Sequence, residues 1–102
     1  MTREEMAALM QRMAGEEDGT PAAGQKEYAH LDENAFRNFD GLAAELKIDR
    51  KLVLWIYLRK HMDGILAYIN GHKSQREDVR GRITDARVYL ALLRGMIEDE
   101  SQ

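Results

Sequence analysis

The chain has 102 residues, enough for one domain but not for a second hydrophobic core. It has no cysteine, which excludes disulfides, thiolate nucleophiles and cysteine-bound zinc. Its net charge of −3 does not favour nucleic acid as the main partner. The longest apolar run covers residues 52–58, far short of the roughly 20 residues that span a bilayer. The first residues also lack the apolar segment of a signal peptide. We therefore expect a single cytoplasmic domain with no membrane partner.

The N-terminal residues predict a helix over about 3–14, followed by a loop. Thr2 and Glu5 have the spacing of a capping box, which marks a helix start. Three methionines and a leucine then recur at helical spacing, and we interpret this stripe as a docking face because methionine adapts to irregular surfaces. Three glycines, three acids and the single proline, Pro21, follow within residues 15–25. We expect a mobile loop there.

Three further helices are predicted from about Glu33, over about 50–70 and over about 76–98, because apolar side chains recur three or four residues apart in each. Asp49 is a suitable N-cap for the second of these helices, and Asn70-Gly71 is a suitable stop. Its first half would also fit a buried strand, but the helical spacing continues over four turns. Short connections favour antiparallel neighbours. The predicted fold class is all-α, a small bundle of about four helices in one domain.

Apolar side chains cover much of the circumference of the last predicted helix near its C-terminal end. Val88, Leu92 and Met96 lie beside the main apolar stripe of this helix. A helix that is apolar on several sides is usually buried on several sides, and three neighbouring helices would leave part of this surface exposed. We therefore predict a homo-oligomer with these three residues near the contact.

Two groups of polar residues could carry chemistry. The turn 59–63 places a lysine, a histidine and an aspartate close enough to hold a phosphate and a metal ion, although ion pairs on a solvated turn would explain the same pattern. Asp78 and Asp85 share a face of the last helix and could hold Mg²⁺ through oxygen ligands. Pairing with neighbours such as Arg82 is the alternative. Tyr89 lies one turn beyond Asp85.

No sequence motif for nucleophilic catalysis is present. The chain has no nucleophile elbow, Walker loop, Rossmann glycine pattern or HExxH motif. Serine occurs only at positions 74 and 101. A serine or cysteine nucleophile is therefore not expected.

Four segments have an order and spacing that match a known group of proteins. They are Lys26-Glu27-Tyr28-Ala29, Asn34-Ala35-Phe36-Arg37-Asn38-Phe39, Tyr57-x-x-Lys60-His61-x-Asp63, and Glu77-Asp78-Val79 followed by Asp85-x-x-x-Tyr89-Leu90. Together they resemble the small all-α phage and prophage proteins called nucleotide-modification-associated domains. The resemblance covers about residues 26–97. It implies a phage-type protein that handles nucleotides in the cytoplasm of the host cell.

That group is distantly similar to MazG-type nucleoside triphosphate pyrophosphatases, which bind Mg²⁺ through acids on two adjacent helices and cleave between the α- and β-phosphates. The segment Asp85–Leu90 resembles their last acidic motif, except that Arg82 stands at a position where that motif has glutamate. The paired glutamates of their preceding helix are replaced by Lys60, His61 and Asp63. The resemblance therefore implies nucleotide or phosphate binding with little or no hydrolysis, and it leaves open whether the protein is an enzyme.

The resemblance also implies a set of site residues. The expected ligand-binding residues, for phosphates and for stacking on a base, are Lys26, Tyr28, Asn34, Phe36, Lys60, His61 and Tyr89. The expected Mg²⁺ ligands are Asp63, Asp78 and Asp85. The alternative function is a non-enzymatic interaction protein that binds a host or phage protein through its apolar last helix.

Overall fold

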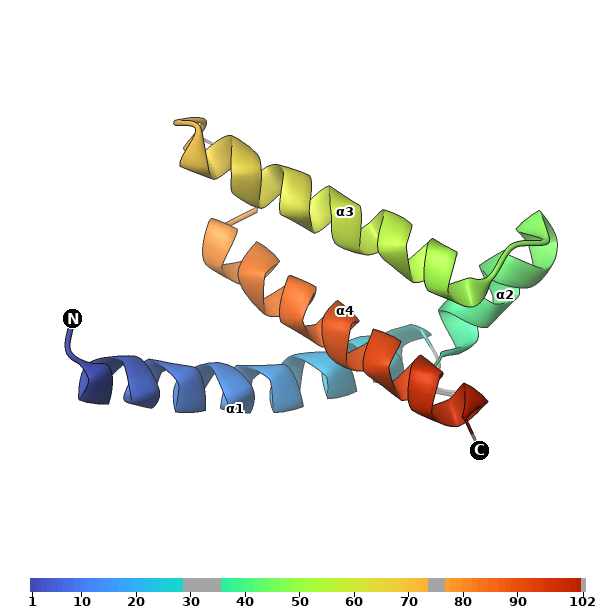
Figure 1. Ribbon diagram of the computed structural model, residues 1–102, viewed down its shortest axis with the longest axis horizontal. Helices are drawn as coiled ribbons and strands as arrows, with labels where there is room; N and C mark the ends of the chain where they lie inside the picture. Colours follow the sequence, from blue (N-terminus) through green and yellow to red (C-terminus); the bar gives the residue numbers. More distant parts are fainter. Residues whose placement is uncertain (29–35, 74–76, 102) are drawn as a thin grey trace.

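The structure is a computed structural model that describes residues 1–28, 36–73 and 77–101, and only the backbone of residues 16–28. The described residues form four helices and no strand (Figure 1). The helices are α1 (Arg3–Tyr28), α2 (Arg37–Leu46), α3 (Arg50–Ile69) and α4 (Val79–Glu100). α3 and α4 run antiparallel and form the largest helix contact, α2 packs on α3, and α1 lies across α4. The predicted all-α fold class is confirmed.

α1 begins where the capping box predicts, and it ends much later than expected. The hydroxyl of Thr2 accepts a hydrogen bond from the backbone N–H of Glu5 at 3.1 Å. The helix then continues to Tyr28, so that the loop predicted over about 15–25 is instead helical. That segment also contains alanine, glutamate, glutamine and lysine, which favour helix. The sequence prediction gave the glycines and Pro21 more weight than these residues.

The ends of α3 and α4 follow local rules that the sequence shows. Asp49 and Asp78 are N-caps, and each carboxylate accepts a hydrogen bond of 2.8 Å from the backbone N–H two residues later. After α3 the chain turns at Gly71, whose φ of 99° suits a residue without a Cβ. The bounds of both helices closely match the predicted ones.

The hydrophobic core lies where α2, α3 and the second half of α4 meet. Its buried side chains are Phe39, Ala43, Val53, Leu54 and Met96. Met96 is 0% exposed, because α2 and α3 together surround it. Leu92 packs at the edge of the same core and Val88 is half-buried. Of the three residues predicted near an oligomer contact, Met96 is therefore not available, since the chain covers it, whereas Val88 and Leu92 are covered only in part.

A polar cluster joins the start of α3 to α2 and to the end of α4. The guanidinium of Arg50 donates to the carboxylate of Asp40 at 3.2 Å and to that of Asp99 at 3.0 Å. It also lies 4.9 Å from the centre of the Phe36 ring, a cation–π distance. The hydrogen bond to Asp99 is the main reason that the pKa of Arg50 is raised.

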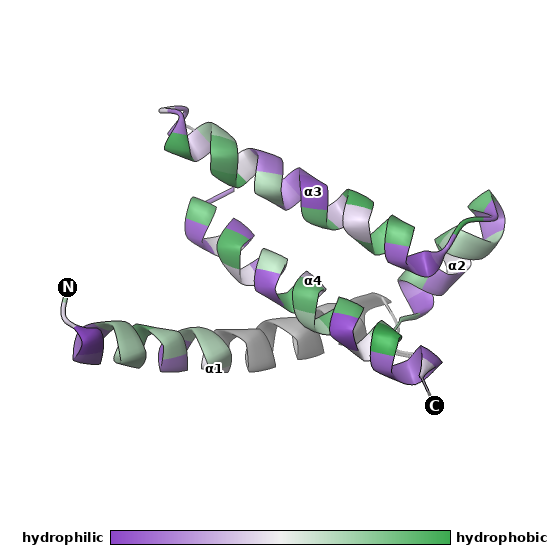
Figure 2. Ribbon diagram, viewed as in Figure 1, coloured by the Kyte–Doolittle hydropathy of each residue, from purple (hydrophilic) through white to green (hydrophobic). Residues whose placement is uncertain are grey.

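The helices leave a large share of their apolar surface uncovered. The radius of gyration is 15.4 Å, compared with about 13 Å for a compact domain of this length. Hydrophobic residues occur along the whole of α3 and α4 (Figure 2), and several of them, such as Trp55, Ile56 and Leu90, are exposed. Within the part of the chain that the structure describes, no helix has both the length and the apolarity needed to cross a bilayer.

A candidate metal and phosphate site between α3 and α4

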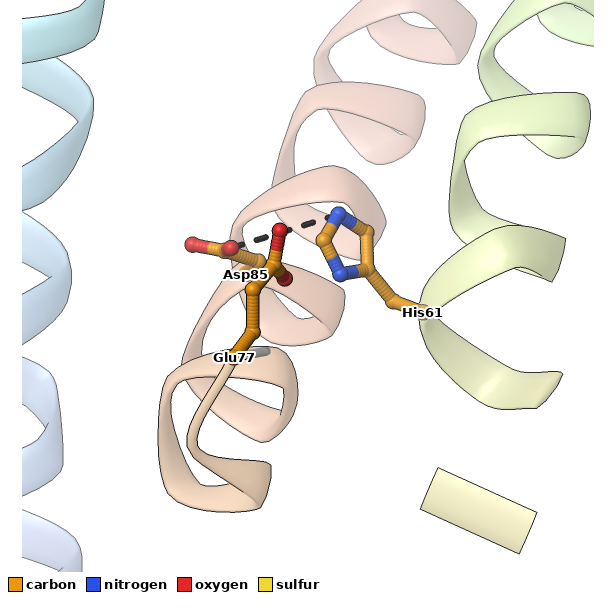
Figure 3. A group of neighbouring side chains, drawn as sticks. All are labelled: His61, Glu77 and Asp85. Carbon is orange, nitrogen blue, oxygen red and sulfur yellow. Dashed lines mark ion pairs between the residues drawn. The ribbon is translucent and has the colours of Figure 1, made fainter. Parts of the chain in front are cut away.

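Three side chains that can ligate a metal converge between α3 and α4 (Figure 3). They are His61 from the middle of α3, Glu77 just before α4, and Asp85 from the second turn of α4. One ligand atom from each lies within 4.8 Å of the other two. In the described ranges, no other group of three histidine or acidic side chains converges in this way.

The two helices place these residues for local reasons. Leu54, Leu58 and His61 are spaced four and three residues apart, so that all three project from the face of α3 that packs on the rest of the chain, and all are buried. Glu77 immediately precedes the N-cap of α4, and its side chain points along this helix toward the imidazole (Figure 3). Asp85 reaches the same point from α4.

The imidazole of His61 is enclosed and its hydrogen bonding is incomplete. The residue is only 7% exposed, and the edge of its ring faces the two acids (Figure 3). Nε2 lies 3.9 Å from a carboxylate oxygen of Asp85, which is too long for a hydrogen bond. Nδ1 is buried and has no hydrogen-bond partner among the described residues. An unpaired buried polar atom costs about 1–3 kcal/mol, so a ligand between the ring and the acids would stabilise this arrangement.

Arg82 adds a largely buried cation beside the acids. Its Nη1 lies 3.8 Å from Glu77 Oε2, its side chain is 14% exposed, and its buried Nε has no hydrogen-bond partner in the described part of the chain. The guanidinium lies against Gly64 of α3, where an added Cβ would come within 2.5 Å of the Arg82 Cζ. Arg82 therefore approaches Glu77, whereas Asp78, the partner considered from the sequence, caps α4. Sequence reasoning missed Gly64 and the position of Arg82, because both depend on how the helices pack.

Two tyrosines form an aromatic wall next to the histidine. The Tyr89 ring lies 5.5 Å from the His61 ring, and it stacks on Tyr57 at 6.4 Å with an angle of 7° between the planes. Burial raises the pKa of Tyr89 above its ordinary value of 10.0, and the negative charge of Asp85 raises it further. The phenol of Tyr89 is therefore neutral at physiological pH.

The predicted ligand-binding residues separate into three groups. His61 and Tyr89 meet at the site, and Lys60 is exposed on α3 next to His61. Phe36 lies elsewhere, since its ring approaches Gly95, ten residues beyond Asp85 on α4. The side chains of Lys26 and Tyr28, and all of Asn34, lie outside the described residues.

The converging metal ligands differ from the predicted set of Asp63, Asp78 and Asp85. Asp85 belongs to the cluster, but Asp63 is exposed and pairs with Arg59 at 3.2 Å, and Asp78 is a helix cap. The reason is helix geometry: Asp63 lies two positions after His61, and residues two apart project to nearly opposite sides of a helix. Glu77, which belongs to the fourth matching segment but not to the predicted set of metal ligands, takes a central place.

Comparison of the chain with protein-family models, curated proteins and solved structures found no match.

Proposed function

We propose that this protein binds a divalent metal ion together with a phosphate-bearing ligand such as a nucleotide, with little or no hydrolysis. The convergence of His61, Glu77 and Asp85 beside the largely buried guanidinium of Arg82 is the observation that carries the proposal. The resemblance of the sequence to phage nucleotide-modification-associated domains, and through them to MazG-type enzymes, supports the same class of ligand.

The ligand set suits Mn²⁺ or Zn²⁺ better than Mg²⁺. Imidazole nitrogen is a common ligand of these transition metals, whereas Mg²⁺ prefers oxygen and retains several waters. Two ligands of one ion with bonds of about 2.1 Å are at most about 4.2 Å apart. The atoms of His61, Glu77 and Asp85 lie within 4.8 Å of one another, so that small side-chain rotations bring them to ligating distance.

Two cations are placed to bind phosphate oxygens at such an ion. Three protein ligands leave coordination positions open, and a phosphate can take them. The guanidinium of Arg82 has the fork geometry that binds phosphate oxygens in pairs. Lys60 is exposed one turn before Gly64, the residue that Arg82 lies against, and it supplies the second cation. The faces of Tyr57 and Tyr89 offer a stacking surface for a base.

Weak hydrolysis follows from the small number of acids. Cleavage of a phosphoanhydride needs a metal-activated water and a base that accepts its proton. Glu77 and Asp85 are the carboxylates of the cluster in the described structure, and both are needed as metal ligands. Arg82 pairs with Glu77, so this carboxylate is also engaged by a cation. The site can therefore hold a phosphate ligand but is poor at activating water.

The test is a calorimetric titration with Mn²⁺, alone and with a panel of nucleotides. Asp85→Asn should weaken Mn²⁺ binding at least tenfold, and Asp63→Asn, a matched substitution on the exposed face of α3, should leave it unchanged. Ligand at 100 times its dissociation constant stabilises the fold by about 2.7 kcal/mol, which a thermal melt readily detects. Absence of metal binding, or equal losses in both variants, would contradict the proposed site. Pyrophosphate release that Asp85→Asn abolishes would show instead that the protein is an enzyme.

A second candidate function, an interaction protein that binds a host or phage protein, is supported by a separate surface. Met6 and Met10 of α1 are exposed, and the main contact that α1 makes with another helix is with α4. The docking face interpreted from the methionine stripe is therefore open at these two methionines. Met10→Glu should abolish co-purification of such a partner and leave Mn²⁺ binding intact, while loss of both would contradict a separate docking role.

A further inference from the structure

An exposed, mainly apolar face of α3 points away from the site and from α4. Its six large side chains, each between 48% and 70% exposed, are Leu52, Trp55, Ile56, Met62, Leu66 and Ile69. At 100° per residue these positions fall within an arc of about 140°, and the buried His61 lies on the opposite side of the helix. We call this surface the outer face of α3. Contiguous apolar patches on this scale are uncommon on monomeric proteins unless they form interfaces.

Two charged residues of opposite sign lie at the centre of the outer face. Arg59 and Asp63 follow the same arc, and their side chains pair at 3.2 Å while remaining exposed. Such an exposed pair contributes only about 0.3–0.5 kcal/mol within one helix. Because charged residues are depleted from the centres of interfaces, this pair must be matched in any partner.

The outer face is complementary to itself under a twofold axis near position 61. Arg59 and Asp63 each lie two residues from that position, Ile56 and Leu66 each lie five residues from it, and Leu52 and Ile69 lie near the two ends. If a second α3 packs antiparallel, Arg59 faces Asp63 of the partner subunit. Ile56 then faces Leu66 of the partner subunit, and the helix ends that carry Leu52 and Ile69 lie opposite each other. A contact of this kind uses the same patch on both copies, as twofold dimers require.

We propose that the protein forms a twofold symmetric homodimer through antiparallel packing of the outer faces of α3. The partner is a second copy of the chain. In an antiparallel pair, the positive Arg59 of each α3 lies opposite a negative Asp63 of the partner subunit, so the charges of the outer face complement those of its own copy. The face is about 27 Å long, and its arc amounts to roughly 400 Å², about half of the roughly 800 Å² per partner in a standard interface. The dimer is therefore weak, and its dissociation constant lies in the micromolar range.

Sedimentation equilibrium between about 1 and 200 μM measures this association. The wild type should pass from monomer to dimer over that range. Trp55→Glu should raise the dissociation constant at least about 30-fold, because it puts a charge in place of a central aromatic side chain. Arg94→Glu is the matched control, since Arg94 also pairs with an acid four residues later but lies on α4. It should leave association unchanged.

A mixing experiment tests the antiparallel register. Arg59→Glu puts two acids, and Asp63→Arg two guanidinium groups, at the centre of each outer face. Each variant alone should therefore associate at least about tenfold more weakly than wild type. A mixture of the two should form a heterodimer of near wild-type affinity, because each introduced charge meets its opposite on the partner. The pair within each helix stays broken in that mixture, so recovery reports contacts between subunits.

Three results would overturn the proposal. A wild type that is monomeric at 200 μM would show that no second copy covers this face. A dimer that survives Trp55→Glu would use another surface. A mixture that stays monomeric while the wild type dimerises would exclude the antiparallel register.

Discussion

Replacing Gly64 by alanine would put a methyl group where the structure has the guanidinium of Arg82. Two effects oppose each other. Alanine in a helix interior is more stable than glycine by about 1 kcal/mol. The new Cβ, however, would lie 2.5–2.6 Å from the Cζ, Nε and Nη1 atoms of Arg82, although carbon contacts are normally about 3.5–4.0 Å. Arg82 must therefore move by about 1 Å or more and leave its position beside Glu77, and such overpacking costs about 1–3 kcal/mol. We expect a net change between zero and about 2 kcal/mol of destabilisation.

Gly41→Ala is the matched control, since an added Cβ there meets nothing within 4 Å. This substitution in α2 should stabilise the protein by about 1 kcal/mol, or about 4–8 °C in melting temperature. Thermal and urea unfolding of both variants give the comparison, and Mn²⁺ and nucleotide titrations show whether Gly64→Ala weakens the site. In an Arg82→Ala background, Gly64→Ala should regain the stabilisation. If Gly64→Ala stabilises wild type as much as Gly41→Ala does, and binding is unchanged, Arg82 does not occupy this space.

Three further predictions concern the charged and titrating groups. Arg50→Met should destabilise the fold by about 2 kcal/mol in urea unfolding, because it removes charge-assisted hydrogen bonds that join α2, α3 and α4. The control is Arg94→Met, at a highly exposed position, which should cost less than about 0.5 kcal/mol. Tyr89 should have a raised pKa in ultraviolet titration, and Asp85→Asn should lower that pKa in part, since burial is the larger cause. The neutral form of Tyr89 is favoured in the folded state, so its contribution to stability is complete below pH 10 and is lost as pH rises through the raised pKa. The backbone N–H of Lys51 donates to the Asp49 carboxylate and lowers its pKa. The stabilising cap is therefore lost as pH falls below about 4. Asp49→Asn should reduce the dependence of the melting temperature on pH in that range.

Periodicity predicted α3 correctly but did not show which side of it is buried. The apolar stripe recognised in the sequence includes Trp55, Leu58 and Met62. In the structure Leu58 is buried, while Trp55 and Met62 are about half exposed. The helix is apolar on two faces, so the 3.6-residue period fits both equally well. The packing of α2 and α4 decides which face of α3 is buried. That packing depends on contacts between residues that are far apart in the sequence.

The candidate site was predictable to the extent that local spacing determines it. His61 and Asp85 were identified from the sequence, because both belong to short segments of the family-like pattern. Glu77 and Arg82 reach the site through the packing of α4 on α3, which local spacing does not encode. Asp63 was assigned to the same cluster because it is close to His61 in the sequence. On a helix a separation of two residues instead places it on the outer face.

One turn of α3 thus carries two proposed interactions on opposite sides: His61 faces the metal site, and Arg59 and Asp63 lie on the outer face. Both matter for a chain whose core is small, since domains of about 100 residues leave a third of their unfolded surface exposed. A metal ion and a second copy bind only the folded state, so each raises its stability by mass action. The melting temperature should therefore rise with protein concentration and with Mn²⁺. The two increases in melting temperature should add, because the metal site and the dimer contact are on different faces of α3 and share no side chain. Trp55→Glu should remove the dependence on protein concentration alone, and Asp85→Asn the dependence on Mn²⁺ alone. If either variant removes both dependences, the two faces are coupled through α3.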